Sequence, residues 1–68
     1  MKALLLACRL LHADPTTIQE YRVSLLDIDS GRTIQVLTTD KRFYETRRGS
    51  CVVARPLQDN RVYYGGNC

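Results

Sequence analysis

The chain has 68 residues, enough for one domain, and a chain this short buries only about 60% of the surface that its unfolded form exposes, so it needs a staple or a partner for more than marginal stability. A hydrophobic content of 44%, a charged content of 25%, four glycines and two prolines exclude a disordered, collagen-like or coiled-coil chain. The formal net charge of +3 is unevenly placed, with −1 on residues 1–31 and +4 on residues 32–68.

The first expected element covers residues 2–11. Its leucines and Cys8 recur at every second position on one face, which predicts a strand, although leucine and alanine are better helix formers. The apolar run is far shorter than the roughly 20 residues that span a bilayer, so no transmembrane helix is expected.

The same run contains Leu5-Leu6-Ala7-Cys8, which resembles the lipobox of a bacterial lipoprotein leader with Cys8 as the lipidated residue. The apolar core ahead of the small residue Ala7 is only four residues long, against the roughly 7 to 15 expected of a secretory signal. We therefore predict an ordinary buried element of the mature fold, and cytoplasmic residence.

The middle of the chain predicts a hairpin. Asp14-Pro15 should end the first element, and Thr17 with Glu20 has the capping-box spacing of one helical turn. A strand is predicted over residues 21–28, where a change of apolar parity indicates either burial on both faces or a bulge. Gly31 supplies the turn, and residues 33–38 return as the second strand.

Residues 41–50 are highly charged and predict an exposed loop or a short edge strand. A central strand should follow at 51–55, ended by Pro56, which lacks a backbone donor. After a turn at 58–60, the last strand is predicted at 61–64.

These elements together predict an all-β fold, or α+β if residues 2–11 are helical. The expected architecture is one domain over residues 1–64, a small five-stranded antiparallel barrel of the SH3-like or OB-like kind, with at most one short helical turn. Residues 65–68 are expected to form a flexible C-terminal tail.

The three cysteines are widely spaced and form no CxxC pair, so we expect neither a metal site nor a structural disulfide. Cys8 and Cys51 are predicted to be small buried hydrophobes, and Cys68 an exposed thiol. The one histidine, His12, is expected in a solvated loop without a catalytic partner. The sequence thus predicts a protein that is not an enzyme and has no cofactor and no catalytic or metal-binding residues.

The basic second half carries the candidate binding site. Cations that contact phosphates, interleaved with aromatic rings that stack on bases, are typical of single-stranded nucleic-acid binding. The candidate residues are Lys41, Arg42, Phe43, Tyr44, Arg47, Arg48, Arg55, Arg61 and Tyr64, with Tyr21 and Tyr63 assigned to the core. The competing interpretation of residues 41–48 is a solvated loop with Phe43 turned into the core.

We therefore predict a small basic protein that binds single-stranded DNA or RNA. The alternative is a phage or mobile-element accessory protein that inhibits or adapts a partner protein, because arginine and tyrosine are also enriched at protein interfaces. Leu5 and Leu11 fall on the opposite parity to the other leucines, which favours a homodimer that would cover them. Neither a small-molecule substrate nor a membrane is an expected partner.

Overall fold

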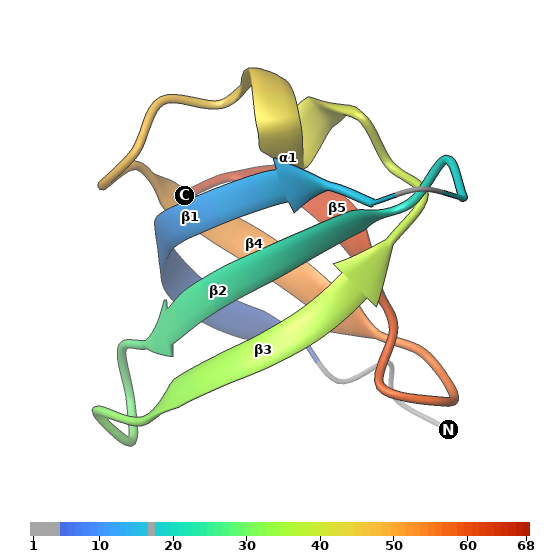
Figure 1. Ribbon diagram of the computed structural model, residues 1–68. Coiled ribbons are helices and arrows are strands. Elements are labelled where there is room, and N and C mark those ends of the chain that lie inside the picture. The colour runs from blue at the N-terminus through green and yellow to red at the C-terminus, as the bar shows by residue number, and fades with distance from the viewer. Residues whose placement is uncertain (1–4, 17) are drawn as a thin grey trace.

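The computed structural model describes residues 5–16 and 18–68, which form five strands and one short helix. All paired strands are antiparallel, in the order β3-β2-β1-β4-β5 (Figure 1), which confirms the predicted small all-β fold. In chain order the elements are β1 (Leu6–Pro15), β2 (Tyr21–Asp27), β3 (Thr33–Thr38), α1 (Arg42–Glu45), β4 (Cys51–Pro56) and β5 (Val62–Asn67).

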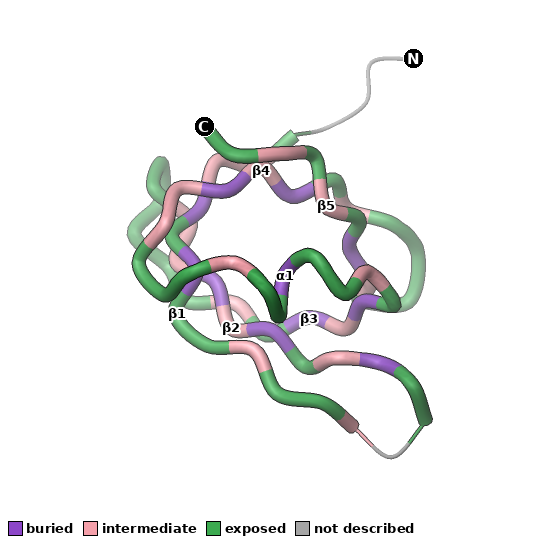
Figure 2. The backbone as a smooth tube through the Cα atoms, turned by 90° about the horizontal axis from the view of Figure 1, so that it is seen from above, coloured by how far each residue is buried: buried purple, intermediate pink, exposed green. Residues whose placement is uncertain are grey.

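The sheet curls strongly but does not close as a continuous barrel. Seen along its axis, the strands surround a centre into which α1 projects (Figure 2). The outer strands β3 and β5 meet at a parallel bridge between Leu37 and Arg61, next to a 3.0 Å hydrogen bond from the Leu37 N–H to the Asn60 carbonyl. We call this junction of β3 with β5 the seam, and the predicted barrel is open there.

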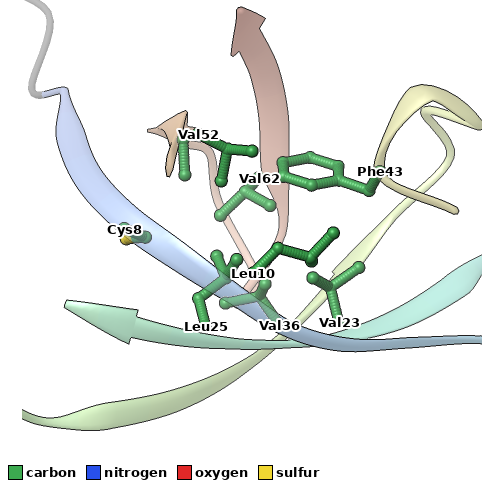
Figure 3. Close-up of a cluster of buried hydrophobic side chains, with 9 residues drawn as sticks. Cys8, Leu10, Val23, Leu25, Val36, Phe43, Val52 and Val62 are labelled. Atoms are coloured by element: carbon green, nitrogen blue, oxygen red, sulfur yellow. The ribbon is translucent and has the colours of Figure 1, made fainter. Parts of the chain in front are cut away.

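The core follows the period-two pattern of the strands. β1, β2 and β4 turn their buried side chains inward at alternate positions, so that Leu10, Leu25 and Val52 meet in one cluster (Figure 3). This confirms strand for residues 6–11 of the predicted element 2–11; Leu4 and the start of the lipobox-like leader lie outside the described residues. Cys8, which such a leader would lipidate, is buried in this core.

β1 continues past residue 11, where the first element was expected to end, and stops at Pro15, as the Asp14-Pro15 pair predicted. Its register with β2 shifts between Leu10 and His12, and pairing then continues to Pro15 opposite Tyr21. Pro15 is tolerated because β4 pairs only with residues 6–9 of β1, so this end of the strand is an edge that pairs with β2 alone. His12 consequently lies in a strand and not in the predicted loop. The predicted helical turn depends on Thr17, which lies outside the described residues.

The C-terminus also differs from expectation. β5 continues to Asn67, and a disulfide joins Cys51 to Cys68 with a Cα separation of 5.2 Å, well inside the range that a disulfide can bridge. The predictions of no disulfide and of an exposed Cys68 thiol are wrong, and residues 65–68 pair with β4 where a flexible tail was expected. The physical reason is the antiparallel pairing of Val52 with Asn67, which brings together two cysteines 17 positions apart.

Residues 41–50 contain the α1 turn, where an exposed loop or edge strand was expected. The Asp40 carboxylate accepts the Arg42 backbone N–H at 3.1 Å, and the Lys41 carbonyl accepts the Glu45 N–H at 3.1 Å. Phe43 is fully buried, so the turn closes one mouth of the curled sheet. The hydrogen bonds of the turn and the burial of the Phe43 ring therefore stabilise a helical turn in this segment despite its high charge.

Candidate nucleic-acid interface

The α1 turn sends its side chains in different directions and so separates the predicted site residues. Phe43 points into the core and packs edge-on against Tyr64, with ring centroids 5.1 Å apart. Arg42 extends toward β5, whereas Tyr44 extends toward β2. Phe43 is thus removed from the predicted interface, as the competing interpretation of this segment required.

Arg42 belongs to a clamp that fastens α1 to the edge of β5. Its Nε and Nη2 atoms donate to the two carboxylate oxygens of Asp40 at 3.0 and 2.7 Å, a bidentate geometry. The guanidinium carbon also lies 5.0 Å from the ring centroid of Tyr64. The Asp40 side chain is only 8% exposed, and its charge is balanced by Arg42. Arg42 therefore contributes far less free positive charge than the sequence implied.

Hydrogen bonds from the Arg42 side chain, together with the backbone N–H groups of Arg42 and Tyr64, hold the pKa of Asp40 below its usual value. A carboxyl group whose pKa is lower in the folded state stabilises the fold above its unfolded pKa, and this contribution disappears as the pH falls through the folded pKa.

We expect Asp40→Asn to lower the free energy of unfolding by about 1.5 to 3 kcal/mol at pH 7, the usual value of hydrogen bonds to a charged group. The difference from the parent protein should begin to shrink below about pH 4, where the carboxyl group of the unfolded state becomes protonated, and should disappear as the pH falls through the lower pKa of the folded state. Urea unfolding at pH 7 and pH 3 measures both. Asp29→Asn, in the exposed β2–β3 turn, is the control, and an equal loss at both pH values would show that the Asp40 charge is unimportant.

Tyr44 forms an exposed aromatic shelf with Tyr21. The two rings stack with centroids 5.3 Å apart and planes inclined by 27°. Tyr44 remains 50% exposed, so Tyr21 holds the ring in place without covering it. Lys41, at the start of the same turn, is exposed and has no ion-pair partner among the described residues. Of the predicted loop residues, Tyr44 and Lys41 are therefore available to a ligand.

The two arginines after α1 differ. Arg47 is exposed and without an ion-pair partner in the described part of the chain, as predicted. Arg48 instead shares a 3.0 Å hydrogen bond with His12 Nδ1, while His12 Nε2 lies 2.7 Å from an Asp14 carboxylate oxygen. An acceptor Nδ1 places the ring proton on Nε2, facing Asp14. Arg48 is therefore tied to the C-terminal half of β1.

Arg55 and Tyr63 make a second aromatic and cationic site on the outer face of β4 and β5. They are direct register partners, and Tyr63 is 49% exposed, with the Arg42 guanidinium carbon 6.0 Å from its ring centroid. Arg55 is exposed and forms no ion pair within residues 5–16 and 18–68. The assignment of Tyr63 to the core and Tyr64 to the surface was wrong: Val62 points inward, so Tyr64, two positions on, shares its face.

Arg61 lies at the seam and is occupied by a structural ion pair. Its Nε donates to Glu20 at 3.0 Å, and the Glu20 side chain is 8% exposed. This contact joins the β1–β2 connection to the start of β5 and supports the seam near Leu37. Arg61 thus helps to close the fold, and the sequence assigned it to the binding site because a lone exposed arginine and a paired one look alike.

An open groove lies beside the seam. It has a volume of about 200 Å³ and is lined by Arg22, Gln35, Val36, Leu37 and Asn60. Sequence reasoning did not single out these residues, because they come from β2, β3 and the β4–β5 turn and share no local motif. The one available signal was Asp59-Asn60, since both residue types tolerate the left-handed conformation that they adopt at φ angles of 60° and 61°.

The described residues contain no group of three or more metal-ligating side chains. The pKa of the Cys8 thiol is raised by burial and by Asp27 and Asp29, so Cys8 is protonated and unsuited to act as a nucleophile. No described helix has the length and apolar character needed to cross a membrane.

Comparison of the chain with protein-family models, curated proteins and solved structures gave no match.

Proposed function

We propose that this protein binds single-stranded nucleic acid across the α1 end of the fold and the outer face of β5. The observation that carries the proposal is the presence of two half-exposed tyrosines, Tyr44 on α1, stacked on Tyr21, and Tyr63 on β5, bordered by the Arg42 guanidinium. Each lies next to a cation without an acidic partner among the described residues: Lys41 near Tyr44, and Arg55 opposite Tyr63.

The chemistry favours a strand with unpaired bases. Tyrosine rings offer flat faces on which bases of any sequence stack, at about 1 to 3 kcal/mol per base, and this requires bases that are not already stacked inside a duplex. Tyr44 is preoriented by its stack on Tyr21, and Tyr63 is bordered by the Arg42 guanidinium, so little side-chain freedom is lost on binding. Lysine and arginine beside the rings supply contacts to phosphate.

Small open barrels of the oligonucleotide-binding kind use the same combination of a basic groove and exposed rings. The similarity is one of architecture only, and one architecture can serve many functions. The support for nucleic-acid binding therefore comes from the exposed tyrosines and the cations beside them.

The decisive experiment is the fluorescence anisotropy of a labelled oligonucleotide titrated with protein over a series of salt concentrations. With two or three phosphate contacts, we expect log affinity to fall with log salt with a slope of about −1.4 to −2.1. Arg55→Gln should make the slope shallower by about 0.7, and Tyr63→Leu should weaken binding by about 1 to 3 kcal/mol with the slope unchanged.

Arg32→Gln is the matched control. Arg32 is an exposed arginine near the β2–β3 turn, at the end of the sheet away from α1 (Figure 1). It should leave both affinity and slope at their parent values. Absence of binding to any oligonucleotide, or binding that ignores salt and Tyr63, would reject the proposal and favour the accessory protein that acts on a partner protein. The homodimer predicted from Leu5 and Leu11, both exposed in the structure, stays a prediction.

A further inference from the structure

The groove beside the seam is a built feature. The Asn60 Nδ2 donates to the Gln35 carbonyl at 2.9 Å, and the Asn60 carbonyl accepts the Leu37 N–H at 3.0 Å. The β4–β5 turn, one wall of the groove, is thereby fastened to β3, its floor. The Glu20–Arg61 ion pair fixes the neighbouring part of the seam. The groove is therefore held open by contacts that do not involve a ligand.

Its lining combines three kinds of group. Leu37 offers an apolar floor, Gln35 and Asn60 offer side-chain amides, and Arg22 offers a guanidinium with no ion-pair partner among the described residues. Because Asn60 Nδ2 is used by the Gln35 carbonyl, its Oδ1 is left as an acceptor without a partner in the described part of the chain. No carboxylate lines the groove, so nothing in it repels an anion.

The volume limits what fits. At about 200 Å³ the groove is smaller than the roughly 300 to 1,000 Å³ of sites for drug-sized ligands, so it has room for one flat ring and not for a folded ligand. A planar ring with hydrogen-bonding edges, linked to a phosphate, satisfies all three kinds of lining group. Amide side chains are also the groups that recognise base edges in nucleic-acid complexes.

We propose that this groove receives a single nucleobase of a bound strand, with Gln35 and Asn60 at the base edge and Arg22 at its phosphate. Arg22 pairs with Leu37 in the register position beside the Tyr21–Thr38 pair, and consecutive strand residues point to opposite faces. The groove therefore lies one residue along β2 from the aromatic shelf but on the outer face of the sheet, and a strand bound to both would pass around the sheet edge. This inference rests on the proposed function and adds base selectivity to it. The stacking tyrosines give affinity without regard to sequence, and the groove supplies the preference.

The test is anisotropy with labelled homopolymers of adenine, cytosine and thymine, each of about twelve nucleotides, a span within that of small barrels. The parent protein should prefer one homopolymer by roughly fivefold or more, the low end of the effect of one base-edge contact. Gln35→Met keeps the length of the side chain but removes its hydrogen bonds, and should bring the three affinities to within about twofold. Arg22→Gln should weaken all three and make the salt slope shallower by about 0.7.

Thr33→Met is the matched control, since Thr33 is exposed on the same face of β3 but outside the groove. The Thr33→Met variant should retain the parent's preference for one homopolymer. Thermal unfolding checks that every variant is folded. Equal affinity of the parent for all homopolymers, or a preference that survives Gln35→Met while Tyr63→Leu still weakens binding, would overturn the groove inference alone. Failure of the parent to bind any homopolymer would overturn the proposed function and this inference with it.

Discussion

We expect Phe43→Ala to remove about 3 to 5 kcal/mol from the free energy of unfolding, the largest stability effect of any side-chain truncation on α1. Phe43 is 0% exposed and is the largest fully buried side chain of the described residues. It fills the mouth of the curled sheet and packs against Tyr64. Truncation leaves a cavity at the point where α1 meets the core.

This loss is a large fraction of the total free energy of unfolding that a chain of this length can have. At about 0.05 to 0.15 kcal/mol per residue, 68 residues provide roughly 3 to 10 kcal/mol in total. Urea unfolding followed by circular dichroism should therefore show that Phe43→Ala has lost about a third or more of the parent stability, and a parent at the lower end of this range would leave the variant unfolded in water. Phe43→Leu, which retains much of the buried volume, should fold with an intermediate loss and keep the measurement quantitative.

Tyr44→Ala is the control for Phe43. Its ring is adjacent in sequence but half exposed, so the loss should be about 1 kcal/mol, the value of one aromatic stacking contact. Similar losses for both variants would show that α1 does not plug the core as its geometry indicates.

Removal of the disulfide is expected to have the second largest effect. Cys51–Cys68 closes a loop with a sequence separation of 17, for which the chain-entropy argument gives about 3 kcal/mol. The bond fastens the end of β5 to the beginning of β4, and the Cys68 N–H donates to the Cys51 carbonyl at 3.0 Å. Cys51→Ser with Cys68→Ser should lower the unfolding midpoint in urea accordingly.

Chemical reduction provides an independent measurement of the same contribution. Dithiothreitol should lower the stability of the parent protein to that of the double variant and leave the double variant unchanged, since the remaining Cys8 is a free, buried cysteine. A parent protein whose stability does not respond to reduction would contradict the prediction. Thiol counting under denaturing conditions, before and after reduction, checks that the bond was present.

Local sequence patterns were sufficient for most of the sheet. Gly31 between two alternating apolar segments defined the β2–β3 hairpin, and it adopts a φ of 74° that few other residues tolerate. The β-branched run at β4 and the period-two leucines of β1 likewise identified strands. These features are visible in sequence because strand alternation and turn conformation depend on neighbouring residues only.

The disulfide and the candidate interface were decided by the tertiary structure. Whether Arg42, Arg48 and Arg61 are free or paired depends on Asp40, His12 and Glu20, and two of these three partners lie 36 and 41 positions away. The groove likewise joins Gln35 to Asn60, 25 positions apart, and the disulfide joins Cys51 to Cys68. The sequence by itself determined which segments become strands and that the second half is basic. Only the curling of the sheet decided which charges are neutralised and which rings face solvent, because ion pairing and burial act over a few ångströms between residues distant in the chain.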